Sequence, residues 1–251
     1  MMTEKLKETS LLGKRILVTG GTTGIGRATV ALLAKTHGAR VLTFGRHEAE
    51  LKDSLDNASG GACGVLGLTA DVATPEGLEA VFEAVDQQLG GLDILINNAG
   101  LSADAIKDMA PEEWRYVVET NFTAYLACAQ KAVQRMSKQG GGHVVFIGSI
   151  SAEFKSPESS VYSATKAGIE AFAETLRKEV MEDNIKVTTI VPGSVGADMQ
   201  QMSPEEQREK IAAKEMLYAE ELADTIGYVL TRSARTNIVT LRAEPLIQHR
   251  G

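Results

Sequence analysis

The sequence predicts one α/β domain built on a doubly wound parallel sheet, and three observations lead to that prediction. First, short apolar runs rich in Val, Ile and Leu recur along the chain without polar alternation, which is typical of strands buried on both faces. Second, the segments between them are long enough for crossover helices. Third, no linker or internal repeat divides the 251 residues, so residues 1–251 are expected to form a single domain. The predicted strands are residues 15–19, 40–44, 65–70, 92–96, 143–147, 186–191 and 238–241.

The clearest predicted helix covers residues 111–138. Apolar side chains recur there at three- and four-residue steps, and Pro111 lies at the first helical turn, where a missing N–H costs little. Alternation of such helices with the apolar runs indicates a doubly wound sheet with helices on both faces.

Composition and charge exclude several classes of function. With 26 Lys and Arg against 33 Asp and Glu, the net charge of −7 argues against a nucleic-acid partner. The sequence contains no stretch of 18 apolar residues, which a membrane-spanning helix would need. The first ten residues lack the apolar core of a secretory signal. Cys63, Cys128 and the four histidines show neither disulfide nor metal-ligand spacing. We therefore expect a cytoplasmic protein without a metal.

A glycine-rich loop follows the first predicted strand and opens a helix. Its spacing, G-x-x-x-G-x-G, suits a backbone that turns tightly, approaches a pyrophosphate and packs closely against the strand. A generic strand-to-helix turn is the alternative interpretation. The residues expected to hold a dinucleotide here are Gly20, Thr22, Thr23, Gly24, Ile25 and Gly26.

Further motifs follow in order at the ends of the predicted strands, namely Asp71, Asn97-Asn98-Ala99-Gly100, Ser149, Tyr162-Ser163-Ala164-Thr165-Lys166 and Pro192-Gly193, with Asn121 in the long helix. With this set, the chain resembles the short-chain dehydrogenase/reductase family from about residue 13 to residue 241. The resemblance implies a Rossmann-type sheet of about seven parallel strands in the order 3-2-1-4-5-6-7. It also implies NAD or NADP as cofactor, hydride transfer between an alcohol and a carbonyl, and a homotetramer or homodimer.

Tyr162 and Lys166 are four residues apart, so on a helix they share one face. We assign Tyr162 as the general acid/base and Lys166 as the cation that lowers its pKa and binds the cofactor ribose. Ser149 would hydrogen-bond the substrate oxygen, and the resemblance gives Asn121 a water that links Lys166 to solvent. The alternatives are an exposed helix face for the Tyr–Lys pair and a helix cap for Ser149.

The end of the second predicted strand bears on the choice of cofactor. NAD enzymes place an acid there for the ribose 2′-OH, whereas this chain has Gly45 followed by Arg46. Guanidinium matches phosphate geometry, which favours NADP with Arg46 on the 2′-phosphate. Two points keep NAD open: Arg46 could be a solvated charge, and neither Thr22 nor Thr23 is basic.

The other expected cofactor contacts lie at further strand ends. Asp71, backed by Val72, would accept from the adenine amino group, although a turn-forming role for Asp71 is the alternative. The remaining expected contacts are Asn98, Ala99 and Gly100 at the ribose, and Val191, Pro192, Gly193 and Val195 at the nicotinamide.

The substrate side departs from the resemblance. Ala197 stands where the family commonly has a Thr, and residues 236–245 lack the family's glycine-rich end. Residues 194–217 are expected to form a substrate lid. Candidate substrate contacts are Ser102, Glu153, Phe154, Lys155, Met199 and Met202. The expected activity is NADP(H)-dependent hydride transfer to a small carbonyl or from a secondary alcohol. The alternatives are the same reaction with NAD(H), or a non-catalytic NADP-binding regulator, against which the retained Tyr162 and Lys166 weigh.

Overall fold

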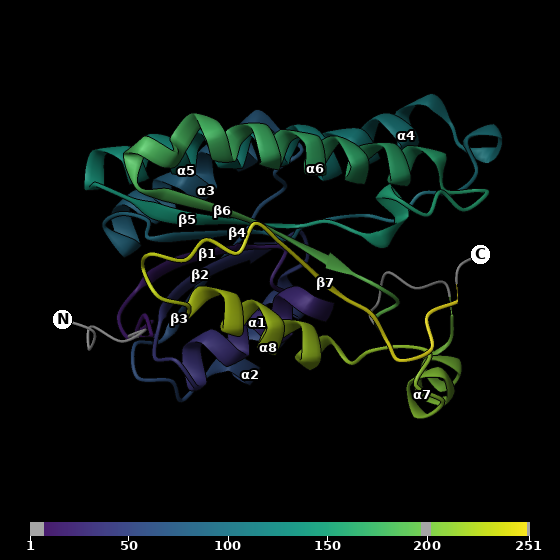
Figure 1. Cartoon of the computed structure of the whole chain (residues 1–251), viewed down its shortest axis with the longest axis horizontal. Coiled ribbons are helices and arrows are strands. Elements are labelled where there is room, and N and C mark those ends of the chain that lie inside the picture. The colour runs from purple at the N-terminus through teal and green to yellow at the C-terminus, as the bar shows by residue number, and fades with distance from the viewer. Residues whose placement is uncertain (1–7, 197–201, 250–251) are drawn as a thin grey trace.

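The computed structural model describes residues 8–196 and 202–249. Its centre is a seven-stranded sheet in the order β3-β2-β1-β4-β5-β6-β7, in which every neighbouring pair is parallel (Figure 1). This confirms the predicted fold class and strand order. The strands are β1 (Arg15–Thr19), β2 (Arg40–Gly45), β3 (Val65–Thr69), β4 (Ile94–Asn97), β5 (Gly142–Ile147), β6 (Ile185–Pro192) and β7 (Thr240–Ala243).

Helices cover both faces of this sheet (Figure 1). One face carries α1 (Gly24–Lys35), α2 (Glu48–Ala58) and α8 (Ala219–Leu230), and the other carries α3 (Pro75–Ala84), α4 (Pro111–Val118), α5 (Ala124–Gln139) and α6 (Ser160–Val180). Helix α7 (Pro204–Ala212) lies beside the C-terminal end of β7, away from both layers. Short helical turns are η1 (Val85–Leu89), η2 (Ile106–Asp108), η3 (Glu119–Thr123), η4 (Ile150–Ala152) and η5 (Met181–Asp183).

The core consists of two apolar layers, one on each face of the sheet. In β1, Leu17 packs into the layer beneath α3, α5 and α6, whereas Ile16 and Val18 pack into the layer beneath α1 and α8. All three side chains are completely buried. Strands buried on both faces account for the continuous apolar runs in the sequence.

Three elements differ from the prediction by more than one residue at an end or by an interruption. The strand expected at residues 92–96 is β4, which begins at Ile94 and ends at Asn97. The helix expected over residues 111–138 is present, but the π-helical turn η3 separates α4 from α5. The last strand was expected at residues 238–241 and instead begins at Thr240, because β7 pairs with β6 from Thr189↔Thr240 to Pro192↔Ala243. Ile238 precedes the strand, and its carbonyl accepts a hydrogen bond from the Thr188 hydroxyl (2.6 Å).

The described residues bear on two of the excluded classes, membrane-spanning proteins and metalloproteins. No helix among the described residues is long and apolar enough to cross a membrane. Within the same part of the chain, no three His, Cys, Asp or Glu side chains come together as a metal site would require.

Candidate active site

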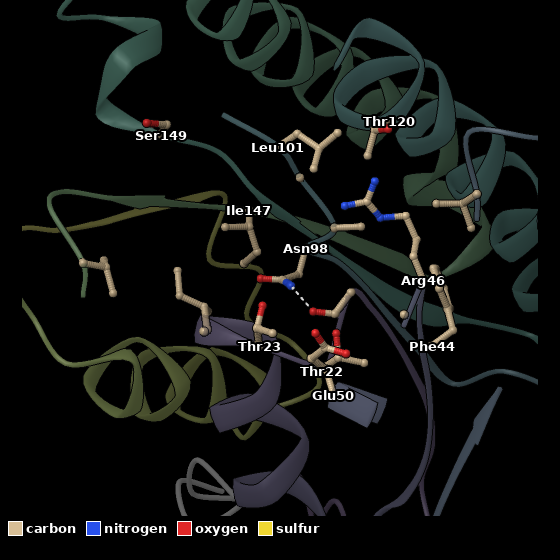
Figure 2. A pocket seen from close by; sticks show the side chains of 18 of the residues that line it. Thr22, Thr23, Phe44, Arg46, Glu50, Asn98, Leu101, Thr120, Ile147 and Ser149 are labelled. Atoms are coloured by element: carbon tan, nitrogen blue, oxygen red, sulfur yellow. Dashed lines mark hydrogen bonds between the residues drawn. The ribbon is translucent and has the colours of Figure 1, made fainter. Parts of the chain in front are cut away.

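A pocket of about 290 Å³ opens at the carboxyl ends of strands β1 to β6 (Figure 2). Open α/β sheets bind ligands at this edge, where the strand order reverses between β1 and β4. The pocket brings together all predicted catalytic and cofactor residues except Gly26, Asn121 and Val191. It is also lined by residues that were not predicted as contacts: Phe44, Gly45, His47, Glu50, Ala70, Leu101, Thr120, Ile147 and Gly148.

The glycine loop is fixed to the end of β4 by hydrogen bonds. Thr19 Oγ1 accepts from the backbone N–H groups of Asn98 (2.8 Å) and Ala99 (2.9 Å). The Asn98 side-chain amide points toward the loop (Figure 2) and donates to the carbonyls of Thr19 and Gly20, at 3.0 Å each. These bonds bring the backbones so close that a Cβ at Gly20, whose φ is +63°, would lie 2.8 Å from the Ala99 Cα. Asn98 therefore shapes the loop through its side chain.

Gly26 is buried behind the pocket, in the first turn of α1. A Cβ there would lie 2.2 Å from the Gly20 carbonyl oxygen, so this glycine allows close packing of the helix against the loop. It is a residue of the loop architecture, not of the pocket wall.

The N-terminus of α1 faces the pocket. Its cap residue, Thr23, makes no side-chain capping bond, and the first turn carries no acidic residue. The first N–H groups of a helix have no intrahelical acceptor, and the helix dipole adds positive potential there. With Thr22, Gly24 and Ile25 on the same wall, this end of the pocket fits the pyrophosphate of a dinucleotide.

At the far end of the pocket, Asp71, Arg46 and Tyr116 form a hydrogen-bonded group. Asp71 Oδ1 accepts from the backbone N–H of Ala73 (3.0 Å), which is the turn-forming role considered above. Its Oδ2 accepts from the Tyr116 hydroxyl (2.6 Å), and Arg46 Nη1 donates to that same hydroxyl (2.9 Å). Sequence reasoning identified Asp71 and Arg46 but missed Tyr116.

Tyr162 and Lys166 lie in the first two turns of α6, on the pocket wall beside Ser149. Burial raises the pKa of Tyr162, and a hydrogen bond with the Ser149 side chain lowers it in part. Burial also lowers the pKa of Lys166 to about 8, while the negative charge of Glu170 works in the opposite direction. The ammonium donates to the Ile147 carbonyl (2.8 Å) and lies 5.7 Å from the centre of the Tyr162 ring. Burial thus raises the Tyr162 pKa, contrary to the lowering expected from Lys166, and the group that lowers it in part is Ser149.

Ser149 and Asn121 each have a structural bond as well. Ser149 Oγ accepts from the backbone N–H of Ser151 (3.1 Å) and caps η4, so the capping alternative holds while the residue still lines the pocket. Asn121 is fully buried in η3 and exchanges two bonds with Leu101: its Oδ1 accepts from the Leu101 N–H (2.7 Å) and its Nδ2 donates to the Leu101 carbonyl (2.8 Å). Asn121 therefore fixes the loop that lines the pocket after Gly100.

The residues predicted as substrate contacts lie either outside the pocket lining or outside the described residues. Ala197 and Met199 lie outside the described residues, as does part of the lid expected at 194–217. The pocket lining does not include the other proposed substrate contacts: Ser102, Glu153, Phe154, Lys155 and Met202. Glu153 instead forms an ion pair with Arg242 (2.6 Å). The C-terminal segment approaches the site, since Gln248 Oε1 accepts from the Ser194 N–H (2.9 Å) next to Gly193.

A family model described as short chain dehydrogenase matches residues 14–208, which is most of the chain. The chain belongs to the short-chain dehydrogenase/reductase family. Among curated members, it is 34% identical over 200 residues to the 3-oxoacyl-(acyl-carrier-protein) reductase FabG of Vibrio cholerae, covering 79% of this chain and 80% of that protein. It is 32% identical to an uncharacterized oxidoreductase of Staphylococcus aureus, covering 95% of this chain and all of the relative.

Solved structures of short-chain dehydrogenases/reductases are similar over nearly the whole chain. The L-sorbose reductase of Gluconobacter frateurii, complexed with NADPH and L-sorbose, has a TM-score of 0.84 at 29% identity and covers 94% of this chain and 96% of its own. An actinorhodin polyketide ketoreductase with NADPH has a TM-score of 0.83 at 28% identity, with coverage of 93% and 96%. The chain is thus an oxidoreductase of this family.

Proposed function

We propose that this short-chain dehydrogenase/reductase transfers a hydride between NADP(H) and a small carbonyl or secondary alcohol. One observation carries the proposal: a single pocket has Tyr162, Ser149 and Lys166 on one wall and a guanidinium, Arg46, without an acid at Gly45, at the other end. NADPH in two similar solved structures and the reductase names of the relatives support it.

The residues of the pocket suit each part of the cofactor. The α1 N-terminus would hold the pyrophosphate and Arg46 the 2′-phosphate. The adenine is assigned to Asp71 and Val72, and the riboses to Asn98, Ala99, Gly100, Tyr162 and Lys166. The nicotinamide side is assigned to Val191, Pro192, Gly193 and Val195, of which Val191 is not part of the pocket lining. When bound, the nicotinamide donates or accepts the hydride.

The chain itself would handle the proton. In the reducing direction, the Tyr162 hydroxyl gives its proton to the substrate oxygen as that oxygen gains negative charge. The Ser149 hydroxyl donates a hydrogen bond to the same oxygen. Lys166, which is cationic at neutral pH with a pKa of about 8, stabilises the phenolate left on Tyr162. In the oxidising direction the phenolate takes the proton from the alcohol. We keep for Asn121 the relay role implied by the family, in addition to its bonds with Leu101.

The test is Tyr162→Phe combined with a panel of carbonyls and alcohols offered with NADPH and NADH. The variant should lose about 10²- to 10⁴-fold in kcat, because general acid/base catalysis contributes that much, while NADP⁺ binding is retained. Tyr228→Phe, which removes a hydroxyl from a half-exposed tyrosine on α8, is the matched control and should keep full activity. Turnover like that of the wild type in Tyr162→Phe contradicts the assignment, and a higher kcat/KM with NADH contradicts the role of Arg46.

The family resemblance also supports proposals about assembly and location. We propose a homotetramer or homodimer in the cytoplasm. Sedimentation of the purified protein measures the oligomeric state, and cell fractionation tests the cytoplasmic location.

A further inference from the structure

Three side chains from separate elements form a chain of hydrogen bonds at the far end of the pocket. Arg46 follows β2, Asp71 follows β3, and Tyr116 lies in α4, 70 residues from Arg46 and 45 from Asp71. The Tyr116 hydroxyl accepts from Arg46 Nη1 at 2.9 Å and donates to Asp71 Oδ2 at 2.6 Å. The Arg46 guanidinium also lies over the Tyr116 ring, 5.7 Å from its centre. The two residues assigned to opposite ends of an adenosine 2′-phosphate are thus joined through a third.

The direction of these bonds is fixed by chemistry. Guanidinium can only donate and an ionised carboxylate can only accept, so the Tyr116 hydroxyl has to accept from Arg46 and donate to Asp71. Burial, reinforced by the hydrogen bond to Asp71, raises the pKa of Tyr116, so its hydroxyl keeps the proton that this arrangement needs.

Tyr116 also determines which way Arg46 points. The arginine is exposed, and within the described residues no carboxylate forms an ion pair with it. Glu50, which lines the same pocket, lies with Thr22 on the opposite side, whereas the guanidinium extends toward the side of Thr120 (Figure 2). The hydroxyl therefore holds the Arg46 guanidinium on the side of the pocket away from the Glu50 carboxylate. It also stands between Arg46 and Asp71, so the guanidinium keeps its positive charge available.

We propose that Tyr116 is a positioning residue that sets the preference for a 2′-phosphorylated cofactor. This inference rests on the proposed NADP(H) function. With Nη1 held by the hydroxyl, Arg46 retains Nε and Nη2 for two parallel bonds to a phosphate. Because the side chain is already oriented, phosphate binding costs less rotamer freedom than it would with a mobile arginine. A cofactor without the 2′-phosphate gains nothing from this orientation. Tyr116 should thus affect NADP⁺ and NAD⁺ unequally.

The experiment measures dissociation constants of NADP⁺, NAD⁺, 2′,5′-ADP and 5′-AMP for the wild type, Tyr116→Phe, Arg46→Gln and the double variant. Tyr116→Phe keeps the ring over the guanidinium and removes only the hydroxyl. We expect the substitution to raise the dissociation constants of NADP⁺ and 2′,5′-ADP about tenfold, which corresponds to about 1.4 kcal/mol of binding free energy. The dissociation constants of NAD⁺ and 5′-AMP should change less than twofold. In the Arg46→Gln background the same substitution should have almost no effect, since the two residues act as one unit.

Tyr228→Phe is the matched control, because the Tyr228 ring also packs against an arginine, with the Arg232 Cζ 4.1 Å from the ring centre. Tyr228 lies on α8, outside the pocket. The control substitution should leave all four constants unchanged. If the wild type prefers NADP⁺ and Arg46→Gln loses that preference while Tyr116→Phe keeps it, the inference about Tyr116 is overturned and the proposed function stands. Equal weakening of NADP⁺ and NAD⁺ in Tyr116→Phe also overturns the inference. A wild type that prefers NAD⁺ overturns the proposed cofactor and this inference with it.

Discussion

Tyr125 is a buried tyrosine whose hydroxyl finds no hydrogen-bond partner among the described residues, and replacing it by phenylalanine should stabilise the protein. The side chain is 1% exposed, and within the described residues its hydroxyl makes no hydrogen bond. The ring stacks on Phe146 with 6.2 Å between ring centres and lies 5.3 Å from Lys166 Nζ. The contacts of Tyr125 thus come from the ring, and the hydroxyl only adds a desolvated polar group.

The expected gain follows from that description. A buried donor without a partner costs about 1–3 kcal/mol, whereas removing it without changing the shape of the ring is close to neutral for packing. Since Tyr125→Phe leaves a void only the size of the hydroxyl oxygen, we expect the free energy of unfolding to rise by about 1 kcal/mol. For a domain of this size, that gain raises the midpoint of thermal unfolding by about 2–4 °C. Activity should not change, because the ring beside Lys166 remains.

Urea unfolding followed by circular dichroism measures the change directly, with thermal unfolding as a second readout. The control is again Tyr228→Phe, whose side chain is 51% exposed and whose effect should stay within about 0.5 kcal/mol. A loss of 1 kcal/mol or more in Tyr125→Phe would refute the reasoning, because it would mean that the hydroxyl has a stabilising partner such as a buried water.

Two further predictions concern other buried groups. The Thr188 hydroxyl donates to the Ile238 carbonyl, so His143 Nε2 must donate to Thr188 (2.8 Å), and burial lowers the pKa of His143 to about 3. Because the unfolded chain then binds more protons than the native one, stability should fall as pH drops from about 6.5 toward 3, and more steeply than in His143→Gln, as measured by urea unfolding across that range. In a thiol-labelling assay, exposed Cys63 should react in the native protein, while Cys128, whose pKa burial raises to about 12, should react only after unfolding; equal labelling rates would contradict this.

The strands could be predicted because burial on both faces of the sheet requires runs of apolar residues, which are visible in the sequence. Most side chains of an inner strand pack into one of the two apolar layers, so its run of apolar residues is nearly continuous. The edge strand β7 has no such apolar run, since its side chains alternate between exposed and half-buried. Its position depends on the register with β6, a contact between residues about 50 apart, which local apolarity does not encode. That is why the prediction for this strand was two residues too early.

The π-helical turn η3 escaped prediction for a related reason. Apolar side chains recur every three or four residues through residues 111–138 whether or not one turn contains an extra residue. The turn does place Asn121, which is fully buried, against the backbone of Leu101 with both amide groups bonded. An amide on an apolar stripe was the one signal in the sequence that this part of the helix is special, because a buried amide without partners is costly.

The pocket could be predicted where function depends on position at a strand end, and not where it depends on contacts between distant segments. Topology places the ends of parallel strands at one edge, so the sequence alone predicts that Asp71 and Ser149 line one site. Tyr116 belongs to no motif and does not stand at a strand end. Its neighbours on α4 are ordinary helix residues, and its partners become adjacent only when β2, β3 and α4 pack together. Specificity that rests on such a contact is therefore invisible to motif comparison. If Tyr116→Phe changes the affinity for NADP⁺ alone, relatives that share every motif can still differ in cofactor preference through this one position.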